Sequence, residues 1–245
     1  MSGERKHVFV TGASRGIGRA IADSLASRGH RIVGHASRPA QGSDKPGYPL
    51  ISADFGDFRS PQMAWSEALD LLGGRIDVLI NNAGIFAANP VERGDAEWLA
   101  AWDETMTINL TASAQLCRLA VYHFRERGGG RIINIASRAA YRGDSPAHWH
   151  YAASKGGMVA MTKTIARAYA ANAIYAFAIC PGFTMTGMAE DYLESRGGEK
   201  LLADIPLGRV AEPHEIATIA AFCATEAPPS MTGAVLDANG ASFVR

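Results

Sequence analysis

The stretch Val8-Phe9-Val10-Thr11-Gly12-Ala13-Ser14-Arg15-Gly16-Ile17-Gly18 indicates the fold of this chain. Val8–Val10 is a short apolar run, which predicts a buried strand, and Gly16–Gly18 opens an amphipathic helix. Glycines let the backbone between them turn sharply and approach a ligand, and the following helix N-terminus favours phosphate. The order strand, glycine loop, helix therefore predicts an α/β protein with a phosphate-binding loop. The alternative interpretation is a plain strand-to-helix turn.

Beyond this loop, apolar strands alternate with amphipathic helices. Strands are expected at 8–10, 31–36, 50–53, 77–80, 131–136, 174–179 and 233–236, with helices from 60 to 73 and at 102–127, 151–171 and 213–225. This alternation predicts a mostly parallel, seven-stranded sheet with helices on both faces. Residues 37–49 are rich in Gly, Pro, Ser and Gln, so a loop is expected there instead of a crossover helix. With no repeat or linker, residues 1–245 are expected to form one domain.

Composition points to a globular protein with a substantial core. The 245 residues are 47% hydrophobic, enough for a sizeable core, and Lys plus Arg balance Asp plus Glu at 24 each. Zero formal charge gives no indication of a nucleic-acid or membrane-surface partner. Cys117, Cys180 and Cys223 are far apart and form no CxxC pair, and the polar N-terminus resembles no signal peptide. A cytoplasmic location is therefore expected.

The end of the second expected strand carries no acid. In dinucleotide-binding folds an Asp or Glu here binds the ribose hydroxyls of NAD, but no carboxylate stands between Arg31 and Gln41. Ser37 and Arg38 follow the strand instead, and Arg15 lies inside the glycine loop. Two guanidiniums suit the 2′-phosphate of NADP(H), which we favour over NAD(H). The alternative is that both arginines are solvated surface residues.

Two further turns follow expected strands. Asp54 ends the third strand, where a carboxylate can accept the adenine amino group. Asn81-Asn82-Ala83-Gly84 follows the fourth strand, and its small residues would let a cofactor lie against backbone at Asn82, Ala83 and Gly84. Asn and Gly are also ordinary turn residues, so two tight turns are the alternative interpretation.

Tyr151 and Lys155 form the chemically most informative pair. Four residues apart on an expected helix, they lie on one face, one turn apart. A phenol normally loses its proton near pH ~10, and a nearby ammonium lowers its pKa towards the working pH. The pair can thus exchange a proton with an alcohol or ketone oxygen, and Ser137, at the end of the fifth strand, can hydrogen-bond the same oxygen.

These motifs together resemble the short-chain dehydrogenase/reductase family, of its compact type. In chain order they are TGxxxGxG (Thr11–Gly18), NNAG (Asn81–Gly84), Asn109, NIAS (Asn134–Ser137), YAASK (Tyr151–Lys155) and PG (Pro181-Gly182). The resemblance spans about residues 7 to 240. It implies a Rossmann-like, doubly wound domain that binds NAD(H) or NADP(H), acts on a carbonyl or alcohol, and forms a homodimer or homotetramer. The helices at 102–127 and 151–171 are expected at the subunit interface.

The resemblance also implies residue roles. Ser137 would orient the substrate oxygen, Tyr151 would be the acid/base, Lys155 would lower the Tyr151 pKa and bind the nicotinamide ribose, and Asn109 would hold a proton-relay water. The expected cofactor contacts are Gly12, Ser14, Arg15, Gly16, Ile17, Gly18, Ser37, Arg38, Asp54, Asn82, Ala83, Gly84, Tyr151, Lys155, Pro181, Gly182, Thr184 and Thr186. The chain departs from the family pattern at Phe177 and in a one-residue longer loop before Tyr151.

The residues expected around the site are compatible with several classes of substrate. Residues 183–208 are expected to form a substrate loop, and Arg138, Arg142, His148 and His150 near the site suggest an anionic substrate or, alternatively, mere rim residues. His148-x-His150 lacks a third ligand at a recognisable spacing, so no metal site is expected. A 3-oxoacyl thioester-type ketone is one substrate class; dihydrodiols and sugar alcohols are others. A non-catalytic NADP(H) sensor is the alternative from another class, and a dehydratase or epimerase is a third interpretation.

Overall fold

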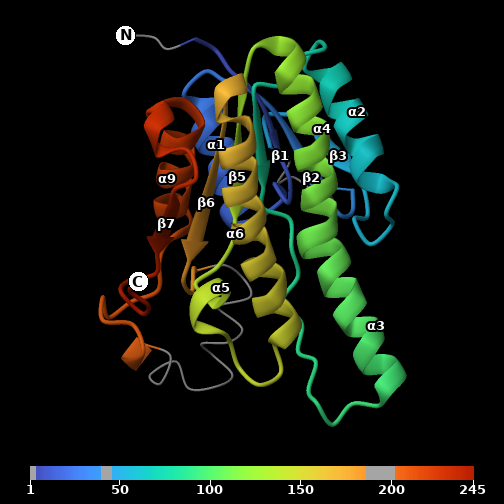
Figure 1. Ribbon diagram of the computed structural model, residues 1–245, viewed down its shortest axis with the longest axis vertical. Coiled ribbons are helices and arrows are strands. Elements are labelled where there is room, and N and C mark those ends of the chain that lie inside the picture. The colour runs from blue at the N-terminus through green and yellow to red at the C-terminus, as the bar shows by residue number, and fades with distance from the viewer. Residues whose placement is uncertain (1–3, 40–45, 186–201) are drawn as a thin grey trace.

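The computed structural model describes residues 4–39, 46–185 and 202–245, which form a seven-stranded sheet with helices around it (Figure 1). The strands lie in the order β3-β2-β1-β4-β5-β6-β7, and all six neighbouring pairs are parallel. Their bounds are β1 His7–Val10, β2 Arg31–Ala36, β3 Leu50–Ser52, β4 Val78–Asn81, β5 Gly130–Ile135, β6 Ile174–Pro181 and β7 Val235–Ala238. The predicted parallel α/β sheet is confirmed.

Helices cover both faces of this sheet. They are α1 Gly16–Ser27, α2 Ser60–Leu71, α3 Asp95–Met106, the π-helical turn η1 Thr107–Thr111, α4 Ala112–Arg127, α5 Ala139–Arg142, α6 Trp149–Tyr169, η2 Ala170–Asn172, α9 Pro213–Thr225 and η3 Pro229–Met231. Successive side chains of a strand point to opposite faces, and β1 shows the result. Val8 and Val10 pack with α1 and α9, whereas Phe9 packs with α2 and α4 on the other face.

The helix expected at 102–127 is longer than predicted. It begins at Asp95, directly after Gly94, and Asp95 and Glu97 place negative charge in its first turn. The π-helical turn at Thr107–Thr111 then joins α3 to α4. The last strand lies at Val235–Ala238, two residues beyond the expected start. Residues 37–39 and 46–49 carry no helix; the rest of the predicted loop lies outside the described residues.

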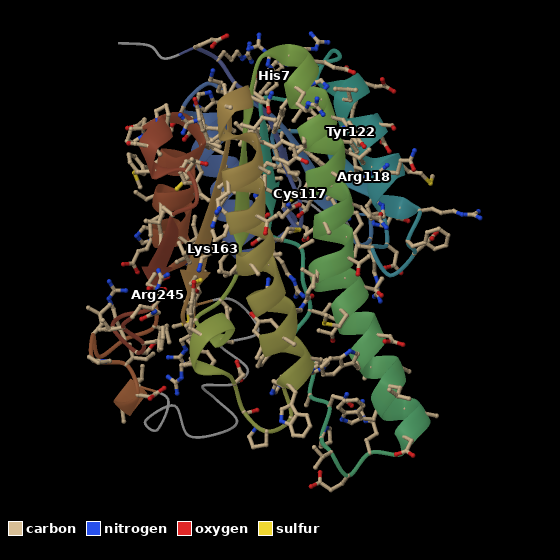
Figure 2. The ribbon with its side chains drawn as sticks, in the orientation of Figure 1. His7, Cys117, Arg118, Tyr122, Lys163 and Arg245 are labelled. Carbon is tan, nitrogen blue, oxygen red and sulfur yellow. The ribbon has the colours of Figure 1, made fainter. Side chains whose placement is uncertain are left out.

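Helices α4 and α6 each have one buried and one exposed face. Cys117 of α4 is buried, whereas Arg118 and Tyr122 on the same helix are exposed, with the guanidinium 5.4 Å from the ring centroid (Figure 2). The exposed face of α6 carries small residues such as Ala153 and Ala160. A subunit interface on these helices stays a prediction. In the described part of the chain, no helix has the length and apolarity needed to cross a bilayer.

Candidate active site at the carboxyl edge of the sheet

The predicted site residues gather at one edge of the sheet. Because all paired strands run in the same direction, their carboxyl ends meet there. The residues that follow successive strands are Gly12 after β1, Ser37 after β2, Asp54 after β3, Asn82 after β4, Ser137 after β5 and Gly182 after β6. Strand order reverses between β1 and β4, which is where doubly wound sheets bind their ligands.

Hydrogen bonds join the glycine loop after β1 to the NNAG turn (Asn81–Gly84) after β4. The hydroxyl oxygen of Thr11 accepts hydrogen bonds from the backbone N–H groups of Asn82 and Ala83, at 2.9 and 3.0 Å. The Asn82 amide in turn donates to the Thr11 and Gly12 carbonyls, each at 3.1 Å. Gly12 has a left-handed φ of 66°, and a Cβ on Gly18 would stand 2.2 Å from the Gly12 oxygen. Only glycine fits these two positions.

The residues predicted to select the cofactor lie around this loop. Ser14, Arg15, Ser37 and Arg38 are all exposed. Asp54 is also exposed, and its carboxylate accepts a 2.9 Å hydrogen bond from the Gly56 N–H, as in an ordinary turn. The structure thus brings the two predicted guanidiniums to the same sheet edge, with solvent access to both.

Sequence reasoning missed His35, the next-to-last residue of β2. Its side chain is 2% exposed and stacks on Phe55 with ring centroids 3.9 Å apart. Nδ1 accepts a hydrogen bond from the Gly12 N–H at 3.3 Å, and Nε2 lies 2.8 Å from the Ala53 carbonyl oxygen. A polar residue inside an otherwise apolar strand was the available signal, because buried polar groups need partners.

Tyr151 lies in the first turns of α6, with Ser137 beside it. The Ser137 hydroxyl accepts the Ala139 N–H at 3.1 Å. Burial raises the pKa of Tyr151 to about 12, and the neighbouring Ser137 hydroxyl acts in the opposite direction. Lys155 is not among the groups that shift the Tyr151 pKa in this structure. The lowering predicted for it stays a prediction for the complex with a dinucleotide.

Lys155 is 4% exposed and one helical turn beyond Tyr151. Its ammonium donates to the Ile135 carbonyl at 2.9 Å and lies 5.8 Å from the centroid of the Tyr151 ring. A Cβ on Gly84 would stand 3.1 Å from the side-chain oxygen of Asn109 and would be in ordinary contact, at 3.6 Å, with the Lys155 nitrogen. Burial lowers the pKa of Lys155 to about 8, so the ammonium loses its proton near the upper end of the usual assay range.

This pKa shift predicts a pH-dependent stability difference between the native protein and Lys155→Met. Between pH about 8 and the ordinary lysine value of 10.5, the unfolded chain still binds the proton that the folded chain has released. Rising pH therefore favours folding of the native protein in this window but not of the variant. We expect urea unfolding to show a relative gain on the order of 2–3 kcal/mol from pH 7 to 10.5. The other titrating groups are common to both proteins, so their contributions cancel in the difference between the two free energies of unfolding. A difference that does not change with pH would contradict the lowered pKa of Lys155.

Asn109 lies in the π-helical turn and is fully buried. Its side-chain oxygen accepts the Ile85 N–H at 2.8 Å, and its amide donates to the Ile85 carbonyl at 3.0 Å and to Ser154 Oγ at 3.3 Å. Asn109 therefore fixes the backbone that follows the NNAG turn. The relay role predicted for it stays a prediction.

The segment after β6 was predicted to meet the cofactor. Pro181 is the last residue of β6, and the Gly182 N–H donates to the Ala238 carbonyl at 3.0 Å. Thr184 is 6% exposed, and its hydroxyl donates to the Gly182 carbonyl at 3.3 Å. Thr186 and most of the predicted substrate loop, including Met188 and Tyr192, lie outside the described residues.

An aromatic cluster borders Tyr151. Phe86 stacks on His148 with centroids 3.9 Å apart and meets the Tyr151 ring edge-on at 4.8 Å. His148 Nδ1 lies 2.7 Å from the Ser145 hydroxyl, and the rings of His148 and His150 are 6.3 Å apart. Among the residues that the structure describes, no three His, Cys, Asp or Glu side chains converge as metal ligands would.

Arg138 and Arg142, which lie between Ser137 and Tyr151, face the carboxylate of Asp204. Arg142 donates to Asp204 at 2.7 Å, and Arg138 lies 3.6 Å from the same carboxylate oxygen. The Arg138 guanidinium also lies over the Phe183 ring, 4.8 Å from its centroid. Their charge is thus partly neutralised within the chain, which favours the rim interpretation over recognition of an anionic substrate.

A glycine loop at the switch point of a parallel sheet, beside a Ser, Tyr and Lys cluster, defines the class of nicotinamide-dependent oxidoreductases. The model for short chain dehydrogenases matches residues 6–197, so this chain belongs to that family. The chain is 34% identical to the 3-oxoacyl-(acyl-carrier-protein) reductase FabG of Vibrio cholerae, over 100% of both chains. It is also 34% identical to the D-threitol dehydrogenase of Mycolicibacterium smegmatis, over 98% of this chain and 94% of the relative.

A solved structure supports the same fold. Aldohexose dehydrogenase from Thermoplasma acidophilum, in its ligand-free form, superposes with a TM-score of 0.87 at 26% identity. The match covers 98% of this chain and 95% of that one. The family predicted from the ordered motifs is confirmed.

Proposed function

We propose that this chain transfers a hydride between NADP(H) and the carbonyl carbon of a ketone or the carbinol carbon of a secondary alcohol. The observation that carries the proposal is the grouping of Ser137, Tyr151 and Lys155: Ser137 acts on the phenol to lower its pKa, and the buried Lys155 ammonium lies 5.8 Å from the centroid of the Tyr151 ring. The Gly12 and Gly18 positions, which leave no room for a Cβ, suit a dinucleotide pyrophosphate against the start of α1.

In this mechanism the chain binds, orients and moves a proton. The nicotinamide, when bound, supplies or accepts the hydride. Ser137 and Tyr151 both donate hydrogen bonds to the substrate oxygen, and Tyr151 delivers its proton as negative charge develops on that oxygen. Lys155 would hold the ribose hydroxyls of the bound dinucleotide and would favour the phenolate left on Tyr151. Asn109 keeps the Ile85 backbone in place below the site.

We assign NADP(H) as the favoured cofactor, with NAD(H) as the alternative. Arg15 and Arg38 are exposed at the loop and after β2, where a 2′-phosphate would stand. We expect Arg38→Ala to raise the KM for NADPH roughly 10- to 100-fold, because charge-assisted hydrogen bonds contribute about 1.5–3 kcal/mol. The KM for NADH should stay within about a factor of two, since NADH lacks the phosphate.

Arg125→Ala is the matched control for this prediction. Arg125 is equally exposed but lies in the last turn of α4, near the amino end of β5 and away from the site. Steady-state kinetics with both cofactors measure the effect. Equal losses with NADPH and NADH in Arg38→Ala would contradict recognition of the 2′-phosphate.

For substrates, we propose neutral ketones and secondary alcohols. A relative named 3-oxoacyl-(acyl-carrier-protein) reductase makes 3-oxoacyl thioesters the first class to assay, and D-threitol dehydrogenase makes sugar alcohols the second; dihydrodiols are a third. Asp204 partly neutralises Arg138 and Arg142, so the loop offers little free charge to a carboxylated substrate. The test is kcat/KM for each class with NADPH or NADP; no turnover of any carbonyl or alcohol would contradict the proposed function.

The residues present argue against the alternative of a non-catalytic sensor. Such a sensor is expected to lack the Ser, Tyr or Lys, and this chain has all three at Ser137, Tyr151 and Lys155.

A homodimer or homotetramer built on α4 and α6 is part of the proposal. Small residues on the exposed face of α6 support it, because they let another helix approach closely.

A further inference from the structure

We infer that His35 is a positioning residue for the dinucleotide, acting through the glycine loop and through the turn that carries Asp54. The inference rests on the proposed binding of NADP(H). His35 itself is 2% exposed, so it acts only through its neighbours.

The hydrogen bonds of His35 join two predicted cofactor stretches, and the chain leads from His35 to a third. Its imidazole receives the Gly12 N–H at 3.3 Å, and its backbone carbonyl receives the next amide, Ala13 N–H, at 2.7 Å. Its other ring nitrogen lies 2.8 Å from the carbonyl of Ala53, the residue before Asp54. Ser37, the first exposed residue after β2, is two positions further along the chain.

The partners of the ring determine its tautomer. A backbone N–H can only donate, so Nδ1 must offer its lone pair to Gly12, and a carbonyl can only accept, so Nε2 carries the hydrogen towards Ala53. A protonated ring would set two donors against each other at Gly12. Burial lowers the pKa of His35 to about 4, which agrees with a neutral ring at any ordinary assay pH.

The position of Gly12 leaves little tolerance for a shift. Its φ of 66° is left-handed, and its environment is close: a Cβ there would be 2.8 Å from the Asn82 amide nitrogen. If the Gly12 backbone N–H turns away from His35, the glycine loop must move with it. This loop is the one proposed to hold the pyrophosphate. Since Tyr151 and Lys155 stand on α6, the proton-transfer groups stay in place.

Two conservative substitutions separate the two ring contacts. In His35→Asn the side-chain oxygen overlies Nδ1 and can still accept the Gly12 N–H, whereas His35→Gln places an amide near Nε2 and keeps only the donor towards Ala53. We expect the Kd for NADPH to rise about tenfold in His35→Ala and in His35→Gln, but no more than about threefold in His35→Asn. kcat at saturating NADPH and the KM for the carbonyl substrate should stay near those of the native protein.

His30→Ala is the matched control. The Nδ1 atom of His30 also accepts a backbone N–H, that of Lys6 at 3.1 Å, but at the amino edge of the sheet. Thermal unfolding should show a loss in both His30→Ala and His35→Ala, whereas fluorescence titration with NADPH should weaken only in the latter. Unchanged NADPH affinity in His35→Ala, or equal weakening in His30→Ala, would overturn the inference. A native protein that fails to bind NADPH would instead count against the proposed function.

Discussion

Replacing Tyr151 by Phe is expected to lower kcat by about a thousandfold or more, because general acid–base catalysis by a positioned side chain contributes roughly 10²–10⁴. The variant removes only the phenol oxygen, on which Ser137 acts. The ring keeps its edge-on contact with Phe86, so the packing at the start of α6 should survive. Single-turnover measurements with NADPH and the best ketone of the substrate panel would give the rate of the chemical step directly.

Cofactor binding separates this result from simple unfolding. The Kd for NADPH in Tyr151→Phe should stay within about a factor of three of the native value, because the glycine loop and α6 are unchanged. Tyr141→Phe is the control: Tyr141 lies in α5, and its hydroxyl accepts a hydrogen bond from Arg245 at 3.2 Å. Near-native turnover in Tyr151→Phe would remove the basis for the proposed mechanism.

Replacing Gly18 by Ala is expected to weaken NADPH binding about a hundredfold or more. The added Cβ would stand 2.2 Å from the Gly12 oxygen and 2.4 Å from the Asn82 amide nitrogen. Gly12 contributes backbone there, so the glycine loop itself must move, and displacement of about 1 Å can cost a hundredfold in activity. The same overpacking should lower the free energy of unfolding by roughly 1–3 kcal/mol. Isothermal titration with NADPH and urea unfolding measure the two effects.

Gly47→Ala is the control for the added methyl group. Gly47 is exposed, and a Cβ there would have no atom within 4 Å. That variant should match the native protein in both measurements. If Gly18→Ala bound NADPH as tightly as Gly47→Ala does, the glycine loop would not be the pyrophosphate site.

The elements with strong local signals could be predicted from sequence. Val8–Gly18 carries an apolar strand, a glycine turn and an amphipathic helix in one short stretch, and the structure has all three. The start of α3 at Asp95 was missed, although Asp95 and Glu97 after Gly94 form an acidic first turn typical of a helix start. The π-helical turn at Thr107–Thr111 has no sequence signal of its own, because it depends on how α3 and α4 pack.

The electrostatics of the site could not be predicted from spacing. Tyr151 and Lys155 stand one turn apart as expected, yet burial dominates both pKa values, raising that of Tyr151 to about 12 and lowering that of Lys155 to about 8. Burial is a property of the packed fold, and the five residues from Tyr151 to Lys155 do not by themselves determine it. His35 was missed for a related reason: its partners, Gly12 and Ala53, come from other strand ends.

Hydride transfer itself is the most direct test of the central claim. NADPH deuterated at C4 of the nicotinamide, on the face from which transfer occurs, would be incubated with the native protein and the preferred ketone, and the alcohol analysed by mass spectrometry. We predict one deuterium on the carbinol carbon of the native product and a rate lower by about a thousandfold in Tyr151→Phe. Alcohol without deuterium from either C4-deuterated form of NADPH, or NADPH that binds and is never consumed with any carbonyl, would contradict the account.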